Sequence, residues 1–106
     1  MKFKRINNSD GSLYGWKFYC PGCAQYDAPD HGRLHQVHVV TTGWTFNGDV
    51  DKPTLSPSVL VTGGFWEDGT NIEVRCHSFV REGRIEFLSD CSHKLAGMTV
   101  ELPEIE

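Results

Sequence analysis

The chain has 106 residues and a formal net charge of −4, with 10 Lys and Arg against 14 Asp and Glu. This length suits one small domain with a modest core. The lack of a basic run argues against a duplex DNA or RNA binder, because such proteins cluster Lys and Arg against phosphates. No segment approaches the roughly 20 apolar residues of a membrane helix, and no secretory signal follows the N-terminus. We therefore expect one domain over residues 1–106, working in a reducing cytoplasm and not on a membrane.

Short segments rich in aromatic and β-branched residues alternate with Gly, Pro, Asn and Asp, a pattern typical of many short strands. No segment repeats apolar residues at helical spacing over several turns, and at most one helical turn is expected, at His93–Ala96. The sequence therefore predicts an all-β fold, a small antiparallel sandwich or partly open barrel. The expected strands are Lys2–Ile6, Leu13–Tyr19, Leu34–Thr41, Ser58–Thr62, Asn71–Val80, Arg84–Leu88 and Met98–Leu102.

The strongest local prediction is a hairpin around Glu82-Gly83, because a two-residue turn ending in glycine suits tightly paired strands. This turn pairs Arg81 with Arg84. Apolar side chains then fall on both faces of the hairpin, with Val80, Ile85 and Phe87 on one face and Phe79 and Leu88 on the other. Strands that are apolar on both faces lie at the centre of a sandwich or barrel.

Cys20-Pro21-Gly22-Cys23 predicts a zinc knuckle, a tight turn that points two thiolates at one ion. A redox pair of the thioredoxin type and a pair of buried free thiols are the alternatives. The redox pair needs a helix start to lower the pKa of its first thiol, and the residues that follow, 24–30, do not indicate a helix. In a reducing compartment the spacing favours a metal ion.

The second half of the metal site comes from Cys76 and Cys91, which fall on one face of the expected hairpin as diagonal neighbours. The simplest site therefore has four thiolate ligands: Cys20, Cys23, Cys76 and Cys91. Zinc is the expected ion and iron the alternative, because tetrahedral thiolate sites accept both.

Two histidines are alternate metal ligands. His93 is the first substitute for Cys91. His35 is the other, because it shares a strand face with Val37 and Val39, which are expected to point inward. A histidine on such a face is more often a hydrogen-bonded core residue than a ligand. His38 falls on the opposite face and is expected to be solvated.

Three residues are catalytic candidates: His77, Asp90 and His93. Alternation places His77 on the opposite face from Cys76, near Asp90. The two form either an oriented acid/base pair or a structural histidine–carboxylate pair. If a histidine completed the metal site and left one position open, the ion would activate a water molecule, whereas four thiolates would close the site.

A polar loop with aromatic flanks is the candidate ligand-binding face, and its expected contact residues are Trp44, Asn47, Asp49, Ser56 and Ser58. Ordered polar groups on a loop beside a stacking tryptophan suit recognition. The competing interpretation is turn and capping chemistry, which Asn47-Gly48 and the Ser and Thr residues beside prolines indicate. We place the second interpretation slightly ahead.

Several motifs together resemble one known family. They are Phe18–Cys23, Trp44–Asp49, Pro53–Ser58, Cys76–Val80 and Phe87–Gly97. The chain is similar over about Tyr14–Pro103 to small proteins of tailed phages and prophages, which have no known function and often carry the automatic label "ammonia monooxygenase". That enzyme is a membrane copper protein, so the label does not suit a chain without a membrane segment. The chain departs from the family by an enlarged loop, Ala24–Leu34.

The resemblance implies a phage-encoded protein in the host cytoplasm, with the family's histidine after the knuckle falling on His35. It supplies no activity. The function predicted from the sequence is a zinc-binding accessory protein that binds a host protein or a small ligand. The alternative is a small metal-dependent hydrolase with an open zinc position.

Overall fold

The computed structural model describes residues 1–27 and 35–105, apart from the side chain of Phe65. Within these residues the fold is almost entirely β, as predicted, with one 3-10 turn, η1 (Cys23–Tyr26). The strands are β1 (Lys4–Asn7), β2 (Leu13–Tyr19), β3 (Val37–Val40), β4 (Thr45–Phe46), β5 (Leu55–Ser56), β6 (Val59–Glu67), β7 (Thr70–Arg81), β8 (Arg84–Phe87) and β9 (Thr99–Glu101). No helix of the described residues is long and apolar enough to cross a membrane.

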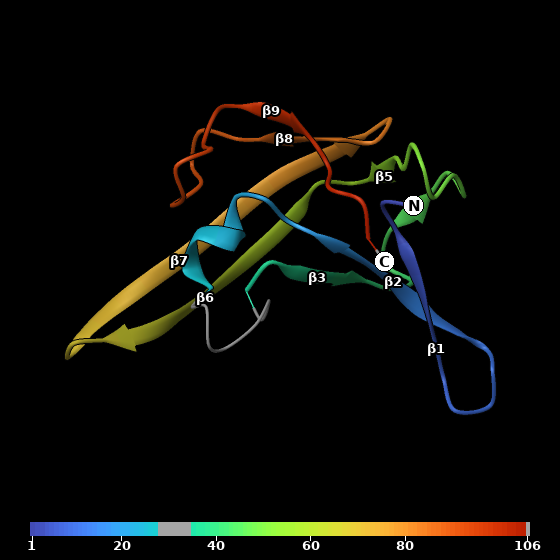
Figure 1. Cartoon of the computed structure of the whole chain (residues 1–106), viewed down its shortest axis with the longest axis horizontal. Helices are drawn as coiled ribbons and strands as arrows, with labels where there is room; N and C mark the ends of the chain where they lie inside the picture. Colours follow the sequence, from blue (N-terminus) through green and yellow to red (C-terminus); the bar gives the residue numbers. More distant parts are fainter. Residues whose placement is uncertain (28–34, 106) are drawn as a thin grey trace.

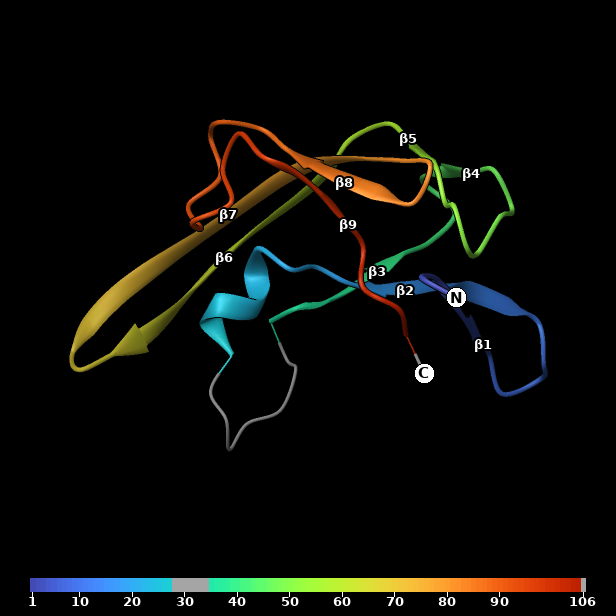
Figure 2. The same ribbon diagram turned by 45° about the horizontal axis from the view of Figure 1, so that its top comes forward.

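The strands form three antiparallel sheets that do not close into a barrel (Figures 1 and 2). Their orders are β1-β2-β3, β4-β5 and β6-β7-β8-β9. The three-stranded and four-stranded sheets share one core, because buried residues of both belong to the same apolar cluster. The prediction of an all-β antiparallel fold without a closed barrel is confirmed.

Aromatic rings join the first sheet to the small β4–β5 sheet. Phe3 stacks on Phe18 with 5.1 Å between ring centroids, and it contacts Phe46 at the same distance. Trp16 meets Phe46 edge-on at 4.9 Å. The four-stranded sheet supplies Val80, Ile85 and Phe87 to the same core, as the hairpin prediction required. Arg81 also pairs with Arg84, so the predicted register of this hairpin is confirmed.

Strand β6 is longer than the sequence predicted. The expected strand Ser58–Thr62 stopped before Gly63-Gly64, because glycine weakens strands and usually marks an interruption. In the structure β6 continues through both glycines to Glu67 and pairs with β7 along its whole length. The two strands turn at Asp68-Gly69, both with positive φ, and form an arm that projects from the rest of the fold (Figures 1 and 2).

The face assigned to β3 from the sequence is wrong. Val39 is 44% exposed, whereas His38 and Val40 are buried, and His35 lies exposed in the turn before the strand. The reason is the pairing of β3 with β2, in which His38 lies opposite the buried Phe18 and so takes the inward face. Hydrophobicity alone selects the wrong face, because Val37 and Val39 share one face whereas Val40 shares the other with His38.

The inverted face of β3 gives a matched test with one substitution at neighbouring positions. Val40→Ala removes a fully buried side chain and is expected to lower the free energy of unfolding by about 2 kcal/mol. Val39→Ala removes an exposed one and is expected to stay within about 0.5 kcal/mol of the parent chain. Urea denaturation measures both values. A larger loss of unfolding free energy for Val39→Ala than for Val40→Ala would show that Val39 points inward, as predicted from the sequence.

Candidate functional site

Strand β7 carries reactive side chains on both of its faces. Cys76 points into the core and is fully buried, while its neighbour His77 points to the opposite face and is only half-buried. This alternation follows from the pleat of a strand, in which successive side chains leave on opposite sides. A thiol cluster therefore lies on one side of β7, and a second polar site lies on the other side.

Three thiols meet behind β7. The Sγ atoms of Cys20, Cys23 and Cys76 all lie within 4.8 Å of one another, and Cys20 and Cys76 are 3.6 Å apart. Cys20 directly follows β2 and Cys23 begins η1, so the Pro-Gly turn brings both thiols to one point. All three residues are at most 1% exposed. Such a buried group of thiols is suited to a soft metal ion in tetrahedral coordination.

The three thiols share their protons unequally. Hydrogen bonds from Cys23 and Cys76 lower the pKa of Cys20 to about 2, since they stabilise its thiolate. The same contact with Cys20 raises the pKa of Cys23 to about 12 and that of Cys76 further still. A bound cation would take the place of the shared protons and hold all three sulfurs as thiolates.

The imidazole of His93 contacts the thiols, whereas that of His38 belongs to neither group of possible metal ligands and only interacts with Cys20 through their charges. His93 Nε2 lies 3.4 Å from Cys76 Sγ, and the ring packs against the bare backbone of Gly22, where a Cβ would overlap it. Its Nδ1 accepts a hydrogen bond from the Leu95 amide at 3.2 Å, which leaves the Nε2 proton facing the thiol. His38 is 5% exposed, and both of its ring nitrogens lack a hydrogen-bond partner among the described residues. Burial lowers the pKa of both histidines and so favours their neutral, ligating form.

Cys91 lies at the edge of this cluster. It forms a second possible metal group with Cys76 and His93, within the same 4.8 Å limit. Its Sγ also accepts a hydrogen bond from the His77 amide at 3.3 Å and donates one to the His77 carbonyl at 3.2 Å. The Cys91 thiol therefore already forms hydrogen bonds with the backbone amide and carbonyl of His77 on β7. His35 is exposed and belongs to neither group of possible ligands within the described residues.

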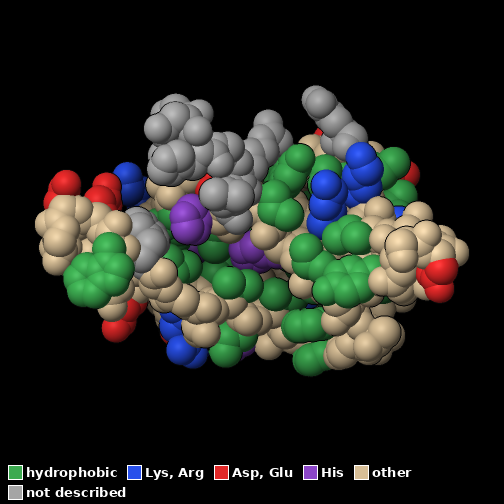
Figure 3. All heavy atoms as spheres, turned by 90° about the horizontal axis from the view of Figure 1, so that it is seen from below, with side chains coloured by type: hydrophobic (Ala, Val, Ile, Leu, Met, Phe, Trp, Pro, Cys, Tyr) green, Lys and Arg blue, Asp and Glu red, His purple; other side chains and the backbone are tan. Residues whose placement is uncertain are grey.

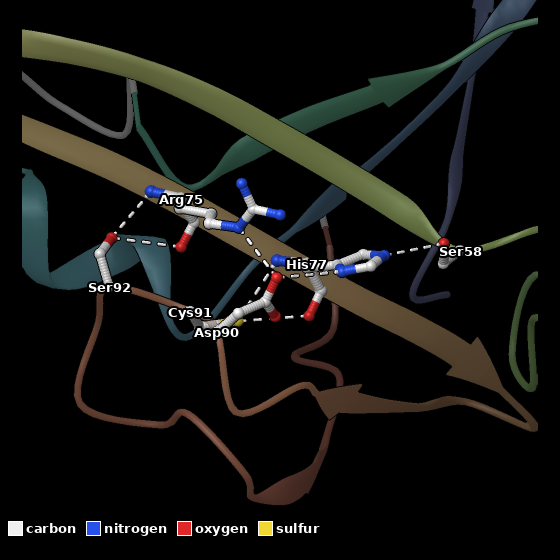
Figure 4. A network of polar contacts seen from close by, with 6 residues as sticks. All are labelled: Ser58, Arg75, His77, Asp90, Cys91 and Ser92. Carbon is white, nitrogen blue, oxygen red and sulfur yellow. Dashed lines mark hydrogen bonds and ion pairs between the residues drawn. The ribbon is translucent and has the colours of Figure 1, made fainter.

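A serine, a histidine and an aspartate meet on the other face of β7 (Figure 4). Ser58 Oγ lies 3.0 Å from His77 Nε2, and Asp90 Oδ2 lies 3.4 Å from His77 Nδ1. Ser58 immediately precedes β6, and Asp90 lies in the segment after β8. With the proton on Nδ1 facing the carboxylate, Nε2 accepts from the Ser58 hydroxyl. This is the order of contacts in a Ser-His-Asp triad.

After β8 ends at Phe87, the segment Leu88–Ser92 continues alongside β7 and places Asp90 next to His77. The Leu88 amide donates to the His77 carbonyl at 2.9 Å, and the Ser92 amide donates to the Arg75 carbonyl at 2.8 Å. Ser92 Oγ accepts from the Arg75 amide at 2.8 Å. These bonds fix the backbone on both sides of Asp90.

Asp90 is held as a carboxylate by Arg75. The guanidinium Nε donates to Asp90 Oδ2 at 2.8 Å, and this contact, ahead of a smaller one from His77, lowers the pKa of the carboxyl group. Arg75 and His77 therefore share one carboxylate oxygen. An ionised aspartate is the form that orients a histidine and stabilises its imidazolium.

The predicted ligand-binding face divides into two parts. Asn47 and Asp49 bind backbone groups of their own turn, including the Thr54 and Lys52 amides, and hydrogen bonds from Lys52 and Asp51 lower the pKa of Asp49. Trp44 instead lines an apolar hollow of about 420 Å³ with Trp16, and its Nε1 donates to the Ser58 carbonyl at 3.3 Å. Ser56 is exposed. Exposed apolar side chains also gather on the face shown in Figure 3.

The order of contacts through Ser58, His77 and Asp90 is one that hydrolases of several unrelated folds share. The chain belongs to the BubE family, described as a bacterial ubiquitination-like system serine protease, whose sequence model matches residues 3–88. Ser58 and His77 lie inside the matched residues, and Asp90 lies just beyond them. No curated protein and no solved structure matches the chain. The match does not address the phage origin and host cytoplasm implied by the resemblance, which stay predictions.

Sequence reasoning selected Ser58 and His77 separately but did not connect them. Ser58 was assigned to a ligand-binding loop, whereas His77 was linked to Asp90, which the structure does place beside it. The missing step was the register of β6 on β7, with Val59 opposite Ser78. Extending that register by one residue places Ser58 opposite Phe79, on the His77 face.

Metal content after single substitutions distinguishes the ligands. Cys23→Ser is expected to reduce bound zinc from about one equivalent to below about 0.2, because a tetrahedral site tolerates the loss of a thiolate poorly. Cys91→Ser is the matched control and is expected to retain the metal, since its sulfur already binds the β7 backbone. Elemental analysis of protein purified without added metal measures both. Full zinc in Cys23→Ser would contradict the assignment.

The fourth ligand is tested with His38→Ala and His93→Ala. Exactly one of these variants is expected to lose the metal, because three thiolates leave one position for nitrogen. If His93 bound the metal through Nε2, its proton would move to Nδ1 and break the hydrogen bond that the Leu95 amide donates there. His38 has no such bond to break, because neither of its ring nitrogens has a hydrogen-bond partner among the described residues. Elemental analysis with a thermal melt separates loss of metal from loss of fold. Retention of metal in both variants would return the fourth position to Cys91.

Proposed function

We propose that this protein is a serine hydrolase that cleaves acyl bonds in polypeptides, with Ser58 as the nucleophile, His77 as the general base and Asp90 as the orienting carboxylate. The observation that carries the proposal is the 3.0 Å contact between Ser58 Oγ and His77 Nε2. The family description, a serine protease, supports the same reaction class. Ser58 and His77 are both only half-buried, so a substrate carbonyl can approach them.

The reaction follows from the roles of the three side chains. Ser58 Oγ attacks the substrate carbonyl carbon while its proton passes to His77 Nε2. His77 then gives this proton to the leaving amine, and an acyl ester remains on Ser58. A water molecule, deprotonated by His77, hydrolyses the ester and restores the hydroxyl group. Asp90 stays ionised throughout and stabilises the imidazolium that forms in both steps.

The 3.4 Å distance between His77 and Asp90 is longer than an ideal charge-assisted hydrogen bond. Catalytic hydrogen bonds are often long in free enzymes and shorten when substrate binds. The Arg75 contact keeps the carboxylate near this position, and the Leu88–Ser92 segment carries its backbone. Substrate binding therefore needs only a small movement to complete the triad.

The thiol cluster supports the catalytic face without taking part in the reaction. Cys20, Cys23, Cys76 and one imidazole would hold zinc with four protein ligands, and the ion would link the turn after β2 to β7, and also to the segment after β8 if the imidazole is His93 or to β3 if it is His38. A site with four protein ligands leaves no open position for water. This is why we assign the hydrolysis to Ser58 rather than to the open zinc position that the sequence suggested as an alternative.

The name of the family suggests the substrate class. The description, a serine protease of a bacterial ubiquitination-like system, points to a protein substrate. We infer that this chain works on a protein as well. An accessory protein that binds a host protein, the function predicted from the sequence, draws no further support from the contacts described above.

The nucleophile is tested with a fluorophosphonate, which reacts with activated serines. Wild-type protein is expected to gain one adduct on Ser58, and Ser58→Ala is expected to gain none. Ser56→Ala removes an exposed neighbouring hydroxyl group and is expected to react like the wild type. Peptide mass spectrometry locates the adduct. No adduct on Ser58 in folded protein, or an adduct on another serine, would refute the proposed mechanism.

Asp90→Asn tests the orienting role, because the amide keeps the shape of the side chain but favours the wrong histidine tautomer. We expect the rate of reaction with the fluorophosphonate to fall by about 10²- to 10⁴-fold, following the effect of the equivalent change in known triads. Glu86→Gln neutralises another carboxylate that pairs with an arginine, Arg81, and is expected to leave the rate within about twofold. Equal rates for Asp90→Asn and wild type would remove Asp90 from the triad.

A further inference from the structure

The arm formed by β6 and β7 extends well beyond the residues that the core needs. From Thr62 to Glu73 nearly every described residue is exposed, and Ile72 is the one exception within that range. A two-stranded hairpin without a core is only marginally stable in water. The outer part of the arm therefore contributes little to the fold, and its length requires another explanation.

One face of the arm is continuous with the catalytic site. Leu60 lies opposite His77, Thr62 opposite Arg75, and Trp66 opposite Asn71. Directly opposed residues of an antiparallel pair share a face. A row of side chains thus runs from Ser58 along β6 to Trp66, a distance of about 26 Å at about 3.3 Å per residue.

The floor of this row is hollowed. A hollow of about 500 Å³ lies between Arg75 and Trp66 and includes Thr62, Gly63 and Gly64 in its lining. Adjacent glycines inside a strand mark a place where another backbone approaches closely. Gly64 belongs to this row, and a Cβ there would lie 3.1 Å from both Asn71 Oδ1 and the Ile72 carbonyl oxygen, so the bare backbone of this glycine leaves the floor of the row open.

Large apolar side chains stand on this row, with Trp66 at the hollow and Leu60 nearer to Ser58. Trp66 is 75% exposed and Leu60 is 48% exposed. An exposed tryptophan lowers solubility and gives the arm no core contact. Tryptophan is, however, enriched among the residues that dominate binding energy in interfaces. The strand β6 is also the edge of its sheet, so its outer backbone groups are not paired within that sheet. An extended polypeptide can use such an edge for hydrogen bonds.

We propose that the arm is the docking surface for an extended stretch of the polypeptide substrate, with the scissile bond at Ser58 and the flanking residues running along β6 to Trp66. This inference rests on the proposed function and adds the form of the substrate to it. A row about 26 Å long accepts several consecutive residues of an extended chain. The site therefore selects polypeptides over small esters and uses Trp66 as the distal anchor.

The test compares fluorescein-labelled unfolded casein with p-nitrophenyl acetate. Trp66→Ala is expected to raise KM for casein about tenfold with kcat within twofold, so that the ratio of casein to ester kcat/KM falls about tenfold. Trp66→Phe is expected to recover most of the ratio. Met98→Ala, which shortens another exposed apolar side chain (49% exposed) away from the arm, is expected to leave both activities unchanged. A thermal melt checks that every variant is folded.

Three results would overturn the docking proposal. The first is an unchanged casein-to-ester ratio in Trp66→Ala. The second is a wild-type protein that gains the Ser58 adduct but cleaves no casein. The third is a concentration-dependent dimer that Trp66→Ala abolishes, since a second copy would then occupy the arm.

A binding measurement that requires no catalysis distinguishes failure of the docking proposal from failure of the proposed catalysis. In the Ser58→Ala background, a benzophenone amino acid in place of Trp66 is expected to cross-link casein at least fivefold more than the same group in place of Met98. Cross-linking at position 66 without any adduct on Ser58 in the wild type would uphold docking and refute the nucleophile. Equal cross-linking at both positions would refute docking.

Discussion

The alternation of side chains along β7 is the constraint on which both sites depend. Cys76 and His77 are neighbours in the chain, yet they leave the strand on opposite sides. The thiol cluster therefore fixes the back of the strand at the residue next to the proposed catalytic base. Any movement of Cys76 relative to the sheet would move His77, because one backbone carries both side chains.

The segment after β8 is the second connection between the sites. Its backbone binds β7 at the Arg75 and His77 carbonyls, Asp90 contacts His77, and His93 lies against Cys76. A run of only a few residues thus touches the thiol cluster at one end and the proposed triad at the other. Small domains have little core to hold such a segment, and a metal ion bound by the thiols and His93 would add a cross-link to it. In this account the ion is structural, and its contribution to activity is positional.

Local chemistry made much of this arrangement predictable from the sequence. The Pro-Gly spacing indicated that Cys20 and Cys23 share a site, and the Glu82-Gly83 turn fixed the hairpin register that separates Cys76 from His77. What the sequence did not provide was contact between segments without a common turn. Ser58 meets His77 only because β6 pairs with β7 in the register that places Val59 opposite Ser78, and His38 turns inward only because Phe18 lies opposite it. Pairing between distant segments sets both contacts, and for His38 it overrides the local hydrophobic pattern.

The most direct measurement of the central claim is the rate at which Ser58 reacts with a fluorophosphonate in metal-loaded and metal-depleted protein. The comparison is made at a temperature where circular dichroism shows that both forms retain their strands. We expect depletion to slow the reaction by about tenfold or more, because the supports of a site hold its reactive groups in place. Restoring zinc should recover the rate. An unchanged rate in depleted protein, with the thiols of Cys20, Cys23 and Cys76 free to react, would contradict the account.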